Sequence, residues 1–263
     1  MESIIKKVLK KIEKNGYECY AVGGYVRDFL LDRKTYDIDI CTNATPDEIK
    51  EIFKTNEKDN FGSVSIKIKK YNIDITTYRE DVKYEKRKPI ELKYLDNLED
   101  DLKRRDFTIN TLCMDRFNNI IDIFDGINDI NNKKIKVVGD VNKKIKEDPL
   151  RILRGIRFAT TLDFLIDDKL DKCIKSNYEL VKELSDYRIR EELTKILESK
   201  NFLKGLELLK KYKILDLLEI NYNEISYKKD VLEMWAQLDF KHNYGFTKSE
   251  LSNIIEIRKK RNE

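Results

Sequence analysis

The chain has 263 residues, of which 40% are hydrophobic, and its 53 Lys and Arg against 49 Asp and Glu leave a net charge of +4. This length is enough for a proper core and one or two domains, and so small a charge is weak evidence for a nucleic-acid partner. Four cysteines without a C-x-x-C pair and a single histidine argue against a zinc site, a disulfide framework and histidine-based catalysis. We expect free thiols in a reducing cytoplasm, and no membrane-spanning segment or signal peptide.

The first part of the chain mixes predicted strands and helices. Strands are predicted at residues 17–22, 36–41, 64–68, 73–78, 120–124 and 134–138. Helices are predicted at residues 25–31, 46–53 and 107–114. The polar segment 79–97 has no apolar periodicity, and we expect it to be a solvated loop.

After Asp148 the pattern changes, because Gly and Pro become rare and amphipathic stretches follow one another. Helical spacing of apolar residues marks the stretches 170–184, 186–197, 202–218, 231–240 and 248–261. We therefore predict a head of strands and helices over residues 1–145 and a helical part over residues 146–263.

Two acids, Asp37 and Asp39, are one residue apart on a predicted strand, so both carboxylates lie on the same face. A glycine pair that includes Gly24 precedes them and opens a predicted helix, whose N-terminal N–H groups can bind phosphate. Carboxylate oxygens suit Mg²⁺, and Asp74 is a further candidate ligand. The pattern predicts a site for a nucleoside triphosphate with Mg²⁺, although solvated acids on an ordinary strand would give the same spacing.

Arginines mark two further segments. In Arg104-Arg105-Asp106-Phe107-Thr108-Ile109-Asn110, Arg105 could contact phosphate and Asn110 a ribose, or the basic pair could be surface decoration with Asp106 as a helix cap.

In the second segment, Asp148-Pro149 is a typical helix start. Arg151, Arg154 and Arg157 then recur every third residue on one face. Arginine offers a planar fork for phosphates and base edges that lysine lacks.

In this order the motifs resemble the class II tRNA nucleotidyltransferases, which include CCA-adding enzymes and bacterial poly(A) polymerases. The shared set is Gly-Gly-x-Val-Arg-Asp, Asp-x-Asp, Arg-Arg-Asp-x-x-x-Asn, Asp-Gly and Glu-Asp-x-x-Arg-x-x-Arg-x-x-Arg-Phe. The resemblance implies an α+β fold, with a polymerase-β-like head that has a mixed sheet and helices, followed by an all-α neck and body. It also implies RNA binding by the helical part over residues 146–263, tRNA as partner, CTP and ATP as substrates, and Mg²⁺ as cofactor.

The resemblance also implies roles for single residues. Asp37 and Asp39 would bind the catalytic Mg²⁺ ions, and Gly24 and Arg27 would hold the triphosphate. Contacts to the incoming nucleotide are implied for Arg105 and Asn110. An amino-acid template that reads the base edge of CTP or ATP is implied for Asp148 and Arg151, with support from Arg154 and Arg157.

The product is left open between CCA, CC, a terminal A and poly(A). The family's CC-adding members have a shortened segment at the place of residues 79–97, and here the segment is retained, which favours CCA. A non-catalytic RNA- or nucleotide-binding protein is disfavoured by the intact acids, and a small-molecule nucleotidyltransferase by the 148–157 helix. One departure is Tyr187-Arg188, where the family usually has Glu-Arg.

Overall fold

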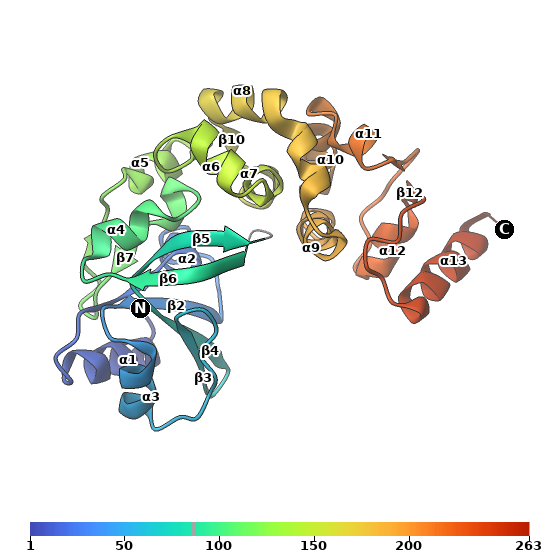
Figure 1. Cartoon of the computed structure of the whole chain (residues 1–263). Helices are drawn as coiled ribbons and strands as arrows, with labels where there is room; N and C mark the ends of the chain where they lie inside the picture. Colours follow the sequence, from blue (N-terminus) through green and yellow to red (C-terminus); the bar gives the residue numbers. More distant parts are fainter. Residues whose placement is uncertain (86–87, 263) are drawn as a thin grey trace. The chain divides into compact units, whose positions relative to one another are not determined.

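The computed structural model describes residues 1–85 and 88–262. The chain forms two compact units, one of Met1–Asn132 with Val137–Gly139 and the other of Lys133–Lys136 with Asp140–Glu263. Figure 1 shows the longer strands in the first unit and the helices that make up most of the second. The division into a catalytic head over residues 1–145 and an RNA-binding part over residues 146–263 stays a prediction.

The first unit is built on a six-stranded sheet with the order β3-β4-β2-β1-β7-β8. The strands are β1 (Cys19–Val22), β2 (Asp37–Thr42), β3 (Ser63–Ile68), β4 (Tyr71–Thr77), β7 (Cys113–Met114) and β8 (Ile120–Ile121). Only β2 and β4 are parallel within this sheet, so it is the mixed sheet that was predicted. The helices are α1 (Ser3–Glu13), α2 (Gly24–Leu30), α3 (Pro46–Phe53), α4 (Leu98–Lys103) and α5 (Gly126–Asn131).

Local sequence signals account for several of these elements. At the start of α3 the Thr45 side chain accepts from the backbone of Glu48, whose carboxylate accepts from Thr45 N at 2.7 Å, which is a complete capping box. Helix α1 buries Ile5, Val8, Leu9 and Ile12, the face expected from its period.

Two expectations for the first unit are wrong. The segment 79–97 is not a loop along its length, because it pairs as an antiparallel hairpin of β5 (Arg79–Glu85) and β6 (Lys88–Tyr94), while Lys86 and Arg87 lie outside the described residues. Residues 107–114 do not form one helix. A single 3₁₀ turn over Thr108–Asn110 is followed by β7, because backbone pairing with β1 takes the place of helix propagation.

The second unit is mainly helical. Its helices are α6 (Val141–Glu147), α7 (Leu150–Thr161), α8 (Asp168–Asn177), α9 (Asp186–Leu197), α10 (Phe202–Lys211), α11 (Ile214–Leu217), α12 (Val231–Ala236) and α13 (Lys248–Asn262). The predicted stretch 202–218 is divided between α10 and α11, because Lys213 adopts a left-handed φ of 57°. Two short strand pairs are additions to the all-α expectation: β9 (Lys134–Ile135) with β10 (Leu165–Ile166), and β11 (Ile220–Asn221) with β12 (Asp239–Phe240).

Within the described ranges, no helix combines the length and apolar character needed to cross a membrane.

Candidate active site

The two acids of β2 lie on the solvent side of the sheet. Asp37 and Asp39 are exposed, whereas Ile38 and Ile40 between and after them are buried. On the parallel neighbour β4, Asp74 is the register partner of Asp39, so its carboxylate lies on the same face. Because the hydrophobic alternation fixes which side chains point inward, it also fixes the acids outward.

Hydrogen bonds orient two of these carboxylates. Asn72 Nδ2 donates to Asp37 Oδ1 at 3.3 Å, and Ser65 Oγ donates to Asp74 Oδ1 at 2.5 Å. Over residues 1–85 and 88–262, no three His, Cys, Asp or Glu side chains gather closely enough to enclose a metal ion by themselves. Two adjacent carboxylates nevertheless fit Mg²⁺, which takes its remaining ligands from substrate phosphates and water.

Gly23 lies where several site residues converge. It has a left-handed φ of 74° just before α2, and its N–H donates to Leu112 O at 3.1 Å. A Cβ at this position would lie 3.5 Å from Arg105 Nη1 and 3.6 Å from Asp39 Oδ2. It would also lie 3.8 Å from the carbonyl of Asn110. The glycine therefore leaves a small space between an acid, an arginine and backbone, and its left-handed φ would strain a larger residue there.

Arg27 and Asn110 hold each other beside this space. Arg27 Nη1 donates to Asn110 Oδ1 at 2.7 Å, and its Nε donates to Asp28 Oδ1 at 2.9 Å. Asn110 Nδ2 in turn donates to Asp106 Oδ1 at 3.0 Å. Both Arg27 and Asn110 are buried, so this network fixes the orientation of a cation and an amide before any ligand binds.

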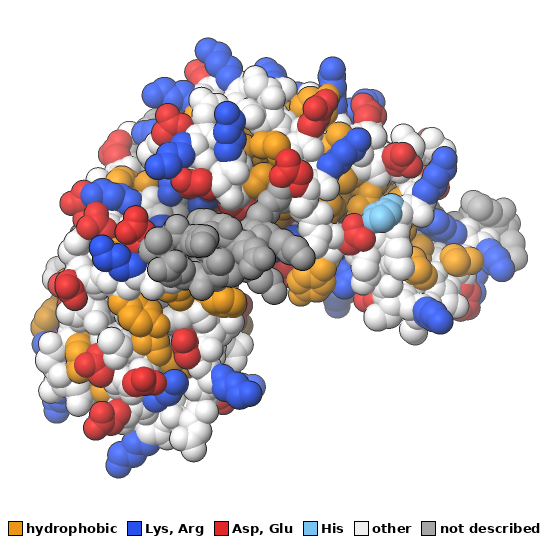
Figure 2. Space-filling model, in the orientation of Figure 1, with side chains coloured by type: hydrophobic (Ala, Val, Ile, Leu, Met, Phe, Trp, Pro, Cys, Tyr) orange, Lys and Arg blue, Asp and Glu red, His pale blue; other side chains and the backbone are white. Residues whose placement is uncertain are grey.

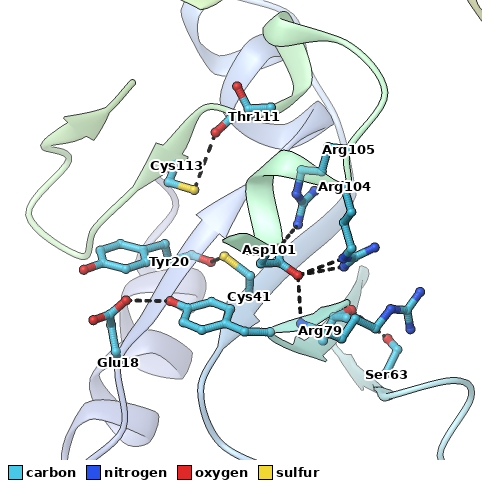
Figure 3. Close-up of polar contacts among 12 residues, drawn as sticks. Glu18, Tyr20, Cys41, Ser63, Arg79, Asp101, Arg104, Arg105, Thr111 and Cys113 are labelled. Carbon is cyan, nitrogen blue, oxygen red and sulfur yellow. Dashed lines mark hydrogen bonds and ion pairs between the residues drawn. The ribbon is translucent and has the colours of Figure 1, made fainter. Parts of the chain in front are cut away.

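Asp101 organises the arginines of the same region (Figure 3). It is fully buried, and its carboxylate forms ion pairs with Arg104 at 2.9 Å and with Arg105 at 3.3 Å. Its Oδ1 also accepts from the backbone N–H of Arg79 at 3.2 Å. One carboxylate from α4 thus positions residues from two other segments of the chain.

The opposite charges of Asp101 and the neighbouring arginines stabilise each other's ionised forms. Burial by itself would raise the pKa of Asp101, but Arg105 and Arg104 outweigh it and the net pKa is lowered. Burial likewise opposes the charge on Arg105, but the neighbouring acidic groups, of which Asp101 contributes most, together outweigh it and the pKa of Arg105 is raised. Both groups therefore stay charged at neutral pH.

In the second unit, Asp148 lies at the start of α7. Its Oδ1 accepts from Leu150 N at 3.1 Å, which caps the first turn. Arg188 of α9 approaches the same carboxylate at 4.0 Å. Arg151 donates to the Lys144 carbonyl and lies 3.7 Å from the Glu147 carboxylate. Neighbouring residues thus hold the side chains of both Asp148 and Arg151 in place.

The remaining arginines of α7 make contacts of their own. Arg157 Nε forms an ion pair at 2.6 Å with Glu192 of α9, which is 3% exposed. The guanidinium groups of Arg157 and Arg154 lie 4.0 and 5.4 Å from the centre of the Phe158 ring. Arg157 therefore joins α7 to α9.

The predicted site residues fall into two groups. Asp37, Asp39, Gly24, Arg27, Arg105 and Asn110 belong to the first unit, and Asp148, Arg151, Arg154 and Arg157 to the second. The predicted site residues did not include Gly23, Asp101 or Arg188. A signal was present for Gly23, the first of the glycine pair, and for Asp101, an acid four residues before Arg105 that falls on the same side of a helix turn.

A net charge of +4 is by itself weak evidence for a nucleic-acid partner. On the face shown in Figure 2, basic and acidic side chains alternate, and no large described area carries one sign. Specific residues must therefore carry the argument for a nucleic-acid partner.

Two family descriptions match the chain. Residues 19–136 match the poly(A) polymerase head domain, and residues 163–221 match a probable RNA- and SrmB-binding site of polymerase A. The CCA-adding enzyme of Lactobacillus helveticus is 39% identical over 237 residues, which cover 89% of this chain and 58% of that enzyme. The CCA-adding enzyme of Staphylococcus haemolyticus is 40% identical over 220 residues, covering 82% and 53%. The chain thus spans about half the length of the curated relatives it matches.

Solved structures similar to this chain come from the same group of enzymes. The Bacillus stearothermophilus CCA-adding enzyme in complex with CTP superposes with a TM-score of 0.73 at 33% identity, covering 80% of this chain and 53% of that one. A tRNA nucleotidyltransferase complexed with a primer tRNA and an incoming ATP analog has a TM-score of 0.68 at 29% identity, covering 87% and 66%.

Proposed function

Because the chain belongs to the tRNA nucleotidyltransferase and poly(A) polymerase family, we propose that it adds CCA to tRNA 3′ ends from CTP and ATP without a nucleic-acid template. The observation that carries this proposal is the convergence of Asp39, Arg105 and the backbone of Asn110 around Gly23. It offers, within one small volume, the acid and the cation that nucleotidyl transfer requires.

The acids fit a Mg²⁺ site by the chemistry of their donors. Asp37 and Asp39 would hold the ion through hard carboxylate oxygens on the exposed face of β2. When bound, Mg²⁺ supplies charge neutralisation at the phosphates and activation of the attacking hydroxyl.

The surrounding residues would position the triphosphate. The RNA 3′-hydroxyl attacks the α-phosphate, the bond to the β-phosphate breaks, and pyrophosphate leaves. Arg105, whose charge Asp101 secures, would stabilise the negative charge that develops on the phosphate oxygens. Arg27 and Gly24 would hold the outer phosphates, and Asn110 would contact the sugar.

Base choice would lie with α7. Asp148 can accept a hydrogen bond from an exocyclic amine, and Arg151 can donate to a ring nitrogen. Cytosine and adenine present that pair, whereas uracil and guanine present the reverse. Arg188, which lies 4.0 Å from Asp148, would help to hold the acid ionised and in place.

The test uses tRNAs that end before CCA, at C and at CC. Each NTP is supplied singly and then all together with Mg²⁺, and the RNA ends are sequenced. Complete CCA ends are expected. Products that stop at CC, products that carry only a terminal A, and long A tails would each identify a different member of the family. No incorporation on any substrate would refute the proposal.

A further inference from the structure

An unusual turn begins β3. Asn60 and Ser63 exchange both backbone hydrogen bonds, at 2.9 and 3.2 Å, so Phe61 and Gly62 form a two-residue hairpin turn. Both turn residues have left-handed backbones, with φ of 51° for Phe61 and 78° for Gly62. Such turns favour Asn or Gly at their first position, and a bulky aromatic there is unfavourable. The sequence therefore keeps a phenylalanine where the backbone opposes it.

A second aromatic side chain lies beside this turn. A Cβ at Gly62 would lie 3.3 Å from the Tyr94 ring and 3.6 Å from Arg79 Cδ and Nη1. Arg79 and Tyr94 are themselves direct cross-strand partners of β5 and β6, so their side chains share a face. Phe61 is 45% exposed and Tyr94 is 42% exposed. We call Phe61, Arg79 and Tyr94 the aromatic patch.

The aromatic patch adjoins the acids of the candidate active site. The side chains of Ser63 and Thr76 are hydrogen-bonded at 3.0 Å, and those of Ser65 and Asp74 at 2.5 Å, so all four lie on one face of the sheet. Asp74 is the register partner of Asp39 on the same face. Gly62 is three residues before Ser65, or roughly 10 Å along the strand. Arg79 also shares Asp101 with Arg105.

From this placement we infer that the aromatic patch binds the single-stranded 3′ end of the RNA, with Phe61 and Tyr94 stacking on its last bases. The inference rests on the proposed function and adds to it a site for the RNA primer. Exposed aromatic rings beside an arginine are the chemistry that holds single-stranded nucleic acid, because every base has a face to stack. A strand whose 3′-hydroxyl reaches Asp39 would carry its preceding bases past this surface.

The decisive variant is Phe61→Asn, because it removes the ring and also suits the turn. It should keep or raise the melting temperature, so a loss of RNA binding could not be attributed to unfolding. Tyr94→Leu removes the second ring and Tyr94→Phe keeps it. Phe117→Asn is the matched control. Phe117 is 62% exposed with the Arg116 guanidinium 3.9 Å from its ring, but it lies between β7 and β8, at the opposite edge of the sheet.

The probe is a tRNA that ends before CCA and carries 2-aminopurine as its last base, whose fluorescence falls on stacking. Phe61→Asn and Tyr94→Leu should each weaken binding of this tRNA about tenfold and abolish the quenching. Phe117→Asn and Tyr94→Phe should match the wild type. CTP affinity in the absence of RNA should be the same in all five proteins.

Two results would overturn this inference alone: unchanged quenching and affinity in Phe61→Asn, or a loss of CTP affinity without RNA, which would assign the patch to the incoming nucleotide. A wild-type protein that quenches the probe through these residues but adds no nucleotide would leave the patch supported and refute the proposed function. A wild-type protein that does not bind the tRNA would refute both.

Discussion

Asp39 is the residue at which the proposed chemistry can be separated from the fold. Its carboxylate is exposed, while the neighbouring Ile38 and Ile40 are fully buried. Asp39→Asn should lower nucleotide incorporation at least about 100-fold, and the free energy of unfolding should change by no more than about 0.5 kcal/mol. Asp47→Asn, at a carboxylate that is 92% exposed on α3, is the control. Near-normal incorporation by the Asp39 variant would contradict a catalytic role.

Asp101 represents the opposite case, a residue needed for both structure and site. Asp101→Asn leaves the Arg104 and Arg105 charges without their buried partner, and should cost about 3–5 kcal/mol of stability at pH 7. Because the folded pKa of Asp101 is lowered, its contribution is complete above about pH 4 and is lost as the pH falls further. The free energy of unfolding, measured with urea between pH 3 and 7, should depend less on pH in the variant than in the wild type. The same pH dependence in both proteins would contradict this account.

Helix α7 allows capping and base reading to be separated. Asp148 caps Leu150 N, and asparagine caps as well as aspartate. Asp148→Asn should therefore keep the stability but admit UTP or GTP relative to CTP and ATP, a discrimination of about 1–3 kcal/mol. Asp148→Ala should lose selectivity and also about 1 kcal/mol of stability. Single-nucleotide incorporation assays and melting curves measure the two effects. Normal selectivity in both variants would leave Asp148 with a capping role alone.

The β5–β6 hairpin is the element on which a switch from CTP to ATP can be tested. Deleting residues 83–89 keeps the Arg79–Tyr94, Glu80–Lys93 and Asp81–Leu92 pairs and leaves three residues to connect the strands, a common hairpin length. The shortened head should fold and add both C residues but fail at the terminal A. End sequencing of the tRNA product shows the result. Complete CCA ends would exclude this role, and loss of all additions would indicate a general one.

At the scale of the whole molecule, the two units are interleaved along the chain. Val137 and Val138 are buried and belong to the first unit, and Val138 N donates to Asp106 O at 3.0 Å. A fragment of residues 1–139 should therefore be more stable than one of residues 1–132, by about 3 kcal/mol for two buried valines. Denaturant unfolding of the two fragments tests this. Equal stabilities would show that residues 137–139 contribute nothing to the unit.

The sequence by itself determined the features that depend on nearby residues. Period-two alternation predicted β2 with its acids outward, the helix predicted over residues 46–53 forms as α3, and the apolar period predicted α9 over residues 186–197. The ordered motifs also identified the family, because they retain the residue types and spacing of its chemistry.

Tertiary structure alone decided which polar groups meet. Arg27 and Asn110 are 83 residues apart and share a hydrogen bond, and Asp101 gathers arginines that no local pattern assigns to it. It also paired Arg79–Glu85 with Lys88–Tyr94 as a hairpin and ended the predicted 107–114 helix after one turn. The physical reason is that caps and periodicity act over a few residues, whereas backbone pairing and the partners of buried charges depend on segments that only folding brings together.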